Sequence, residues 1–136
     1  MTDSTERVSD LVLVYQLVVE WAWRLDHDEA RSLTDLIADE FVFTGFAEPI
    51  VGADGLRAWA DAREARIGRK THHQMTNIRI HRRAGDRITA SSSLVLRTVT
   101  PEQPQPKIEF VGEYRDELLL TPGGWRFARR DLVALG

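Results

Sequence analysis

The segment Thr71-His72-His73-Gln74-Met75-Thr76-Asn77-Ile78-Arg79-Ile80 stands where the hydrophobic pattern of the chain changes. From Thr71 onward, apolar and polar residues alternate with a period of two, which is typical of β-strands. In the residues before this segment, apolar side chains recur at helical spacing. Helices in the first half and strands in the second half predict an α+β fold rather than alternating βαβ units.

Four long strands are expected after this change, over residues 72–83, 87–99, 107–120 and 125–133. The breaks between them contain glycine, proline or aspartate and therefore have turn chemistry. Short connections of this kind join antiparallel neighbours, so the strands should form a meander. If the sheet curls around the helices, it forms a cone whose open mouth is a ready ligand site.

The first half of the chain predicts three helices and a short strand. The first helix runs from about residue 4 to residue 26, and its buried face is expected to contain Val8, Leu11, Val12, Tyr15, Val18, Val19, Ala22 and Leu25. A second helix is expected over residues 28–37, with Asp28 as its N-cap. A third begins near Asp54 and ends at Gly68. Residues 41–43 are expected to form the strand, and residues 45–52 a loop.

The composition bounds the class of protein. The chain has 136 residues, which suits one domain over residues 1–136. The formal net charge is −3, so no basic excess is available to neutralise nucleic-acid phosphates. The polar N-terminus lacks a signal-peptide pattern, and the longest apolar run is too short to span a bilayer. We therefore expect a cytoplasmic protein with neither a nucleic-acid nor a membrane partner.

Neither a metal nor an organic cofactor is indicated. The chain has no cysteine, and His72 and His73 are adjacent, so they diverge in a strand. No glycine-rich phosphate loop precedes a helix, and no G-x-S-x-G motif is present. Any chemistry is thus expected to come from side chains alone.

Asp26 and His73 are the strongest candidates for such chemistry. Asp26 follows Ala22 by four positions and so falls on the inner side of the first helix. A helix that packs across a curved sheet could bring this carboxylate to the imidazole, and a buried His–Asp pair can move a proton near neutral pH. The alternatives are a histidine bonded to backbone near a strand end, and an aspartate that helps to cap the next helix. Alternation alone does not decide whether His72 or His73 faces inward.

Several segments together resemble the SnoaL-like group of the nuclear-transport-factor-2-like superfamily. They are Arg24-Leu25-Asp26-His27-Asp28, Phe41-Val42-Phe43 with the later Val51-Gly52, Gly55-Leu56-Arg57-Ala58-Trp59, Thr71-His72-His73, Met75-Thr76-Asn77-Ile78 and Gly124-Trp125-Arg126-Phe127-Ala128-Arg129-Arg130. The resemblance covers nearly the whole chain. It implies a cone-shaped α+β barrel with N-terminal helices packed on a curved, mixed but mostly antiparallel sheet. The group includes scytalone dehydratase, polyketide cyclase and ketosteroid isomerase relatives.

The resemblance also implies roles for individual residues. Dehydratase-like members carry an aspartate at the end of the first helix and a histidine at the start of the first long strand, which correspond to Asp26 and His73. The histidine acts as acid or base, and the aspartate orients it. This sequence departs from the dehydratases at Leu25, where they have a tyrosine, and it lacks their second catalytic histidine on the next strand. It also lacks the isomerase's catalytic aspartate after the short strand.

The remaining candidates are residues expected to surround a ligand. The polar ones are Tyr114, Asn77 and Ser92, and the aromatic ones are Trp21, Phe43, Phe46, Trp59 and Phe110. The predicted function is a cofactor-independent lyase or isomerase, dehydratase- or cyclase-like, acting on a small hydrophobic carbonyl compound. The alternative is a non-catalytic protein that binds a ligand or serves as a partner subunit. The resemblance implies a homodimer, with a trimer as the other assembly.

Overall fold

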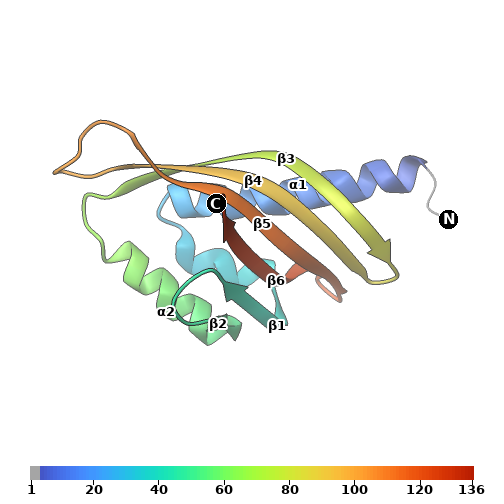
Figure 1. Cartoon of the computed structure of the whole chain (residues 1–136). Coiled ribbons are helices and arrows are strands. Elements are labelled where there is room, and N and C mark those ends of the chain that lie inside the picture. The colour runs from blue at the N-terminus through green and yellow to red at the C-terminus, as the bar shows by residue number, and fades with distance from the viewer. Residues whose placement is uncertain (1–3) are drawn as a thin grey trace.

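The computed structural model describes the backbone of residues 4–136 and the side chains of residues 7–136. Three helical elements, α1 (Ser4–Asp26), the 3-10 helix η1 (Ala30–Leu36) and α2 (Gly52–Glu64), pack on a six-stranded sheet. The strands are β1 (Ile37–Thr44), β2 (Ile50–Val51), β3 (Lys70–Ala84), β4 (Arg87–Val99), β5 (Lys107–Thr121) and β6 (Gly124–Ala134). Figure 1 shows the long strands bending around α1, with α2 at one end of the sheet.

The sheet has the order β2-β1-β6-β5-β4-β3. Every neighbouring pair is antiparallel except β1 and β6, which run parallel. The predicted mixed, mostly antiparallel sheet is therefore confirmed, and the strand predicted over residues 87–99 has the observed bounds of β4. The other three long strands extend one or two residues beyond the predicted ends.

The core lies between α1, η1 and the concave face of the sheet. Trp21 is fully buried there and makes edge contacts with Phe43 and Phe127, at centroid distances of 5.5 Å each. A buried ion pair lies beside this cluster. In it, Arg130 donates two hydrogen bonds, of 2.8 and 3.1 Å, to the carboxylate of Asp116. Burial raises the pKa of Asp116, while the Arg130 charge opposes that rise.

The buried face of α1 differs from the predicted one. Val8, Leu11, Val12, Tyr15 and Val19 are exposed, whereas Val14, Val18, Trp21, Ala22 and Leu25 form the buried face. Apolar residues surround much of this helix, so the sequence period did not single out one face. Asp10 is buried on the inner side, where Arg83 neutralises it through two hydrogen bonds of 2.6 Å.

The predicted second and third helices need correction. Residues 28–37 do not form an α-helix, because only a 3-10 helix spans Ala30–Leu36 and β1 begins at Ile37. Asp28 does not cap it, since its φ of 58° places it in the preceding turn. The third helix begins at Gly52 rather than Asp54, and it ends at Glu64, before Gly68. The predicted loop over residues 45–52 contains the two-residue strand β2, which is too short to show a period.

Candidate active site

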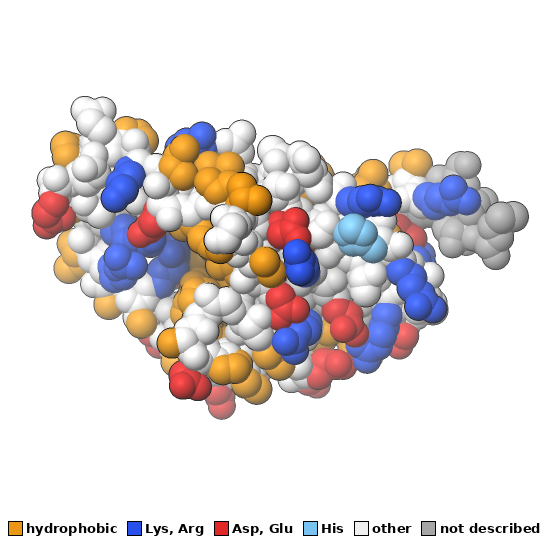
Figure 2. All heavy atoms as spheres, viewed as in Figure 1, with side chains coloured by type: hydrophobic (Ala, Val, Ile, Leu, Met, Phe, Trp, Pro, Cys, Tyr) orange, Lys and Arg blue, Asp and Glu red, His pale blue; other side chains and the backbone are white. Residues whose placement is uncertain are grey.

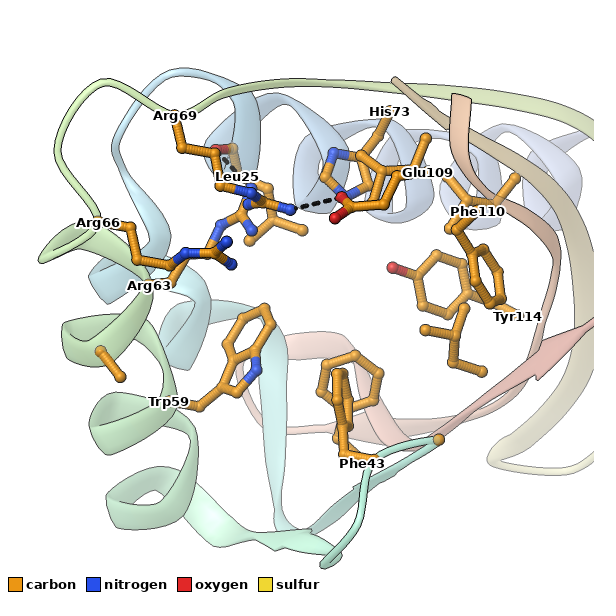
Figure 3. Close-up of a pocket in the computed structure, with 16 residues that line it drawn as sticks. Leu25, Phe43, Trp59, Arg63, Arg66, Arg69, His73, Glu109, Phe110 and Tyr114 are labelled. Carbon is orange, nitrogen blue, oxygen red and sulfur yellow. Dashed lines mark hydrogen bonds and ion pairs between the residues drawn. The ribbon is translucent and has the colours of Figure 1, made fainter. Parts of the chain in front are cut away.

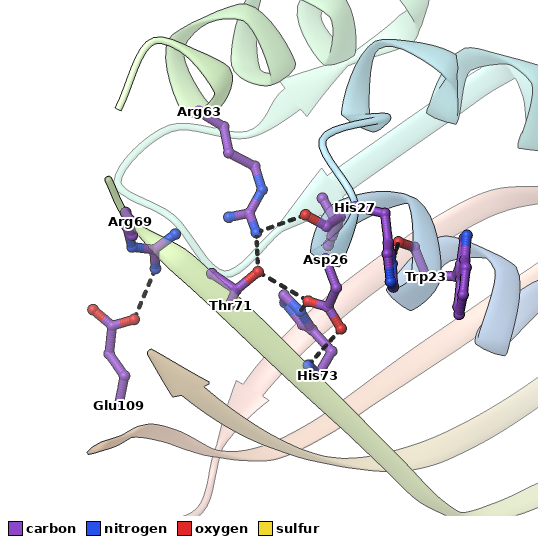
Figure 4. Close-up of polar contacts among 9 residues, drawn as sticks. Trp23, Asp26, His27, Arg63, Arg69, Thr71, His73 and Glu109 are labelled. Carbon is purple, nitrogen blue, oxygen red and sulfur yellow. Dashed lines mark hydrogen bonds and ion pairs between the residues drawn. The ribbon is translucent and has the colours of Figure 1, made fainter. Parts of the chain in front are cut away.

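Asp26 and His73 meet at the end of α1 (Figure 4). Oδ1 of Asp26 lies 2.6 Å from Nδ1 of His73, and Oδ2 accepts a hydrogen bond of 2.8 Å from the His73 backbone N–H. The two side chains are 9% and 5% exposed, respectively. The carboxylate therefore fixes both the position of β3 and the orientation of the imidazole ring.

Two further residues complete the polar network around Asp26. The Thr71 hydroxyl donates to Oδ1 of Asp26 at 2.9 Å, and Arg63 donates to the Thr71 hydroxyl at 2.8 Å. Burial alone would raise the pKa of Asp26. Hydrogen bonds from the His73 side chain and backbone, the His73 charge and the Thr71 hydroxyl together lower that pKa below its usual 3.8. Asp26 is thus held as a carboxylate that accepts a hydrogen bond from the Nδ1–H of His73.

His73 lines a cavity of about 440 Å³ (Figure 3). The cavity is bounded by α2, the ends of β3, β4 and β5, and the loop after β1. Its lining comprises Leu25, Phe43, Gly45, Phe46, Trp59, Ala62, Arg63, Arg66, Arg69, His73, Leu94, Leu96, Glu109, Phe110, Tyr114 and Leu132. Because Asp26 engages Nδ1, the nitrogen left for a bound molecule is Nε2. Asp26 itself lies behind the imidazole and does not line this cavity.

Three of the predicted aromatic residues, Phe43, Phe46 and Trp59, form one wall of the cavity. Phe43 contacts Phe46 and Trp59 edge-on, at centroid distances of 4.9 and 5.6 Å. Figure 3 shows the Tyr114 hydroxyl pointing into the cavity from the opposite side to Trp59. Burial raises the pKa of Tyr114, although the positive charge of Arg130 opposes that rise. The phenol therefore stays protonated at neutral pH and can donate a hydrogen bond.

Three predicted ligand-contacting residues lie outside the cavity lining. Trp21 is buried in the core against Phe127 rather than at the cavity wall. Ser92 is buried opposite Tyr114 in the β4–β5 register without reaching the cavity. Asn77 was expected to contact a ligand, but its φ of 53° and a register shift after Thr76 interrupt the strand alternation, and the residue is exposed.

Three arginines in the lining were not predicted. Arg63, Arg66 and Arg69 project toward the cavity from the last turns of α2 and the segment before β3 (Figure 3). Arg69 pairs with Glu109 at 2.8 Å. Their spacing of three residues, with Arg63 on the inner face of the predicted helix, is the sequence signal that identifies them. Charged residues near a helix end are usually solvated, which is why the signal is easily missed.

Between residues 7 and 136, no group of three histidine, aspartate or glutamate side chains is placed to hold a metal ion. No helix of the described chain has the length and apolar character that crossing a membrane requires.

Comparison with known proteins identifies the family. Residues 6–131 match the model of the SnoaL-like domain, so the chain belongs to the SnoaL-like family. A search of curated proteins by sequence finds no match.

Solved structures share the fold. A variant of Rv3472, a protein of unknown function from Mycobacterium tuberculosis, has a TM-score of 0.86 and 25% identity, covering 99% of this chain and 77% of that one. A provisionally named scytalone dehydratase from Novosphingobium aromaticivorans has a TM-score of 0.83 and 18% identity, covering 96% and 87%. An NTF2-like protein with a cystatin-like fold from the same organism has a TM-score of 0.76 and 23% identity, covering 99% and 92%. The fold is accordingly NTF2-like.

Proposed function

We propose that the protein is a cofactor-independent lyase or isomerase in which His73 removes a proton next to a carbonyl group. The observation that carries the proposal is the contact of 2.6 Å between Asp26 Oδ1 and His73 Nδ1 at the wall of a cavity of about 440 Å³. This contact supports the tautomer in which Nδ1 bears the proton and Nε2 has a free lone pair. A base in that state is ready to accept a proton from a molecule in the cavity.

Each polar group then has a defined task. Nε2 of His73 takes the proton, and the imidazole becomes positively charged. The Asp26 carboxylate stabilises that charge. The Tyr114 hydroxyl donates a hydrogen bond to the substrate oxygen on which negative charge develops. Return of the proton from Nε2 to another carbon gives isomerisation, and its transfer to a leaving hydroxyl gives dehydration.

The main alternative is a cone that only binds a ligand or a partner subunit. The dyad argues against it, because a buried carboxylate is costly unless it is paired and hydrogen-bonded. A binding protein gains nothing from a base that faces an otherwise largely apolar wall. The family relationship fits both catalysis and a binding role and does not decide between them. The chemistry of the dyad favours catalysis.

Proton abstraction can be tested without knowing the natural substrate. The protein is incubated in D₂O with small cyclic ketones, beginning with 2-tetralone, and loss of the proton signal next to the carbonyl is followed by NMR. We expect exchange above the buffer rate with the wild type and a loss of about 10²–10⁴-fold in His73→Gln. Tyr114→Phe should also slow exchange.

His72→Gln is the matched control, because His72 is the adjacent histidine on β3 and points away from the cavity. It should exchange within twofold of the wild type. Equal rates in His73→Gln and His72→Gln, or no exchange above buffer with any ketone, would leave the binding or subunit role as the better explanation.

A further inference from the structure

We infer that the substrate carries a carboxylate, and that Arg63, Arg66 and Arg69 form an anion site at the mouth of the cavity. The inference rests on the proposed function only in calling the ligand a substrate.

The three guanidinium groups lie together on one side of the cavity. Figure 3 shows them opposite the Tyr114 hydroxyl, with His73 placed between the two ends. The backbone N–H of Arg66 donates to the Arg63 carbonyl at 3.2 Å, so a helical turn continues beyond the end of α2. With a spacing of three residues along this turn, the arginines face the same side. In the space-filling view, basic atoms border a hollow that has apolar atoms inside it (Figure 2).

The positive charge at this end is only partly balanced by acidic side chains of the protein. Glu109 is the single acidic side chain in the cavity lining, and it pairs with Arg69. Two acids of α2 that could neutralise Arg66, Asp61 and Glu64, contact Arg31 instead, at 2.6 and 3.4 Å. Among the described residues, no acidic side chain contacts the Arg66 guanidinium.

Arg63 is also held in place without a carboxylate. It donates to the Thr71 hydroxyl at 2.8 Å and to the Leu25 carbonyl at 3.4 Å, both of which are neutral acceptors. Burial and the nearby Arg69 charge lower the pKa of Arg63, while the charge of Asp26, which lies beyond Thr71, opposes that fall. Cations gathered in a cleft with apolar walls concentrate anions, and guanidinium groups match a carboxylate geometrically.

The arrangement also orients a ligand for the proposed chemistry. An apolar body fits against Phe43, Trp59 and Phe110, while the carboxylate lies at the arginines. A carbonyl at the other end of the same molecule reaches the Tyr114 hydroxyl. Figure 3 shows His73 between the arginines and Tyr114, so a carbon between the two groups of such a ligand would face His73.

The test compares two probes of the same shape by isothermal titration calorimetry, 2-naphthoate and its neutral amide, 2-naphthamide. We expect 2-naphthoate to bind at least tenfold more tightly. Arg66→Gln should weaken 2-naphthoate binding about fivefold, as expected for a partly exposed charge contact, and leave 2-naphthamide unchanged. Arg66→Gln combined with Arg69→Gln should remove most of the preference, and raising the salt concentration should do the same.

Arg57→Gln is the matched control, because Arg57 lies on the outer side of α2, pairs with Asp54 and is not part of the lining. It should bind both probes like the wild type. Equal affinity for the two probes, no binding of 2-naphthoate at millimolar concentration, or an equal effect of Arg57→Gln and Arg66→Gln would overturn the inference. Repeating the titration with His73→Gln separates the two proposals, since loss of proton exchange must leave the preference for 2-naphthoate intact.

Discussion

Replacing Asp26 by asparagine tests the central contact of the site. The Asp26 carboxylate accepts three hydrogen bonds, of 2.6 Å from the His73 ring, 2.8 Å from the His73 backbone and 2.9 Å from Thr71. An asparagine keeps one acceptor oxygen, and its amide nitrogen only donates. The variant therefore loses the charge of the pair and one or two of the three bonds, with little change in volume.

The expected cost follows from these losses. A hydrogen bond to a charged group contributes about 1.5–3 kcal/mol, so the free energy of unfolding should fall by about 2–4 kcal/mol at pH 7. With a urea slope of about 2 kcal/mol per molar, the midpoint falls by about 1–2 M. The neutral imidazole should also lose its preference for a proton on Nδ1, which long-range ¹H–¹⁵N NMR detects.

The pH dependence has a defined sign. Because the pKa of Asp26 is lowered in the folded state, its stabilisation is fully present above the unfolded value of about 3.8. That stabilisation is lost as the pH falls through the folded value. The stability difference between wild type and Asp26→Asn should therefore be largest near neutrality and shrink below about pH 4.

Urea unfolding at pH 7 and pH 3, followed by circular dichroism, measures this difference. Asp28→Asn is the matched control, because it is the same substitution two residues away, in an exposed turn. Asparagine also tolerates the φ of 58° at this position. It should change stability by less than about 0.5 kcal/mol. A difference for Asp26→Asn that is equal at both pH values, or no larger than that of Asp28→Asn, would refute the reasoning.

Three further predictions concern the surrounding structure. Arg130→Met leaves the Asp116 carboxylate unpaired in the core and should cost about 3–5 kcal/mol, as measured by urea unfolding, with recovery in Arg130→Met combined with Asp116→Leu. Because burial raises the pKa of Asp116, the single variant should gain stability as the pH falls from 7 toward 5, and a flat profile would contradict this. Gly112→Ala should prevent normal pairing of β5 with β6, because the added Cβ would overlap the Val133 carbonyl oxygen and lie 2.7 Å from the Phe110 ring. A thermal melt should show this loss, whereas Gly55→Ala, a helical position where the nearest atom to the new Cβ is 3.6 Å away, should fold normally. Thr71→Val removes the hydrogen bond to Asp26 and the acceptor of the Arg63 guanidinium, and it should lower stability by about 1–2 kcal/mol and ketone exchange by less than tenfold. An effect on exchange as large as that of His73→Gln would show that Thr71 does more than position the dyad.

The sequence predicted the sheet well and the helices less well, for physical reasons. A period of two over a dozen residues, closed by turns such as Ala84-Gly85-Asp86, leaves little freedom in strand position. The buried face of α1 was not predictable because both sides of the helix are apolar, and packing against β3 decides between them. The two residues of β2 are too few to carry any period.

The residues of the candidate site were likewise predicted only in part. The pairing of Asp26 with His73 was anticipated from the family pattern, since both positions are fixed by the ends of regular elements. Asn77 was misplaced because its positive φ interrupts the alternation of the strand. Asparagine is among the residues that adopt such a φ, but the regular period of the segment does not reveal it. The three arginines were missed because charged residues near a helix end are usually solvated, and their spacing of three residues gained meaning only from the position of this end of α2 at the cavity.

One feature of the site separates proton transfer from ligand recognition. The dyad is built by α1 and β3, whereas Trp59, Ala62 and Arg66 line the cavity from α2 and the turn that follows it. Arg63 joins the two parts through its bond to Thr71. Directed evolution can therefore randomise positions 59, 62 and 66 to select proteins that accept ligands of another charge or shape, while His73 and Asp26 are kept unchanged.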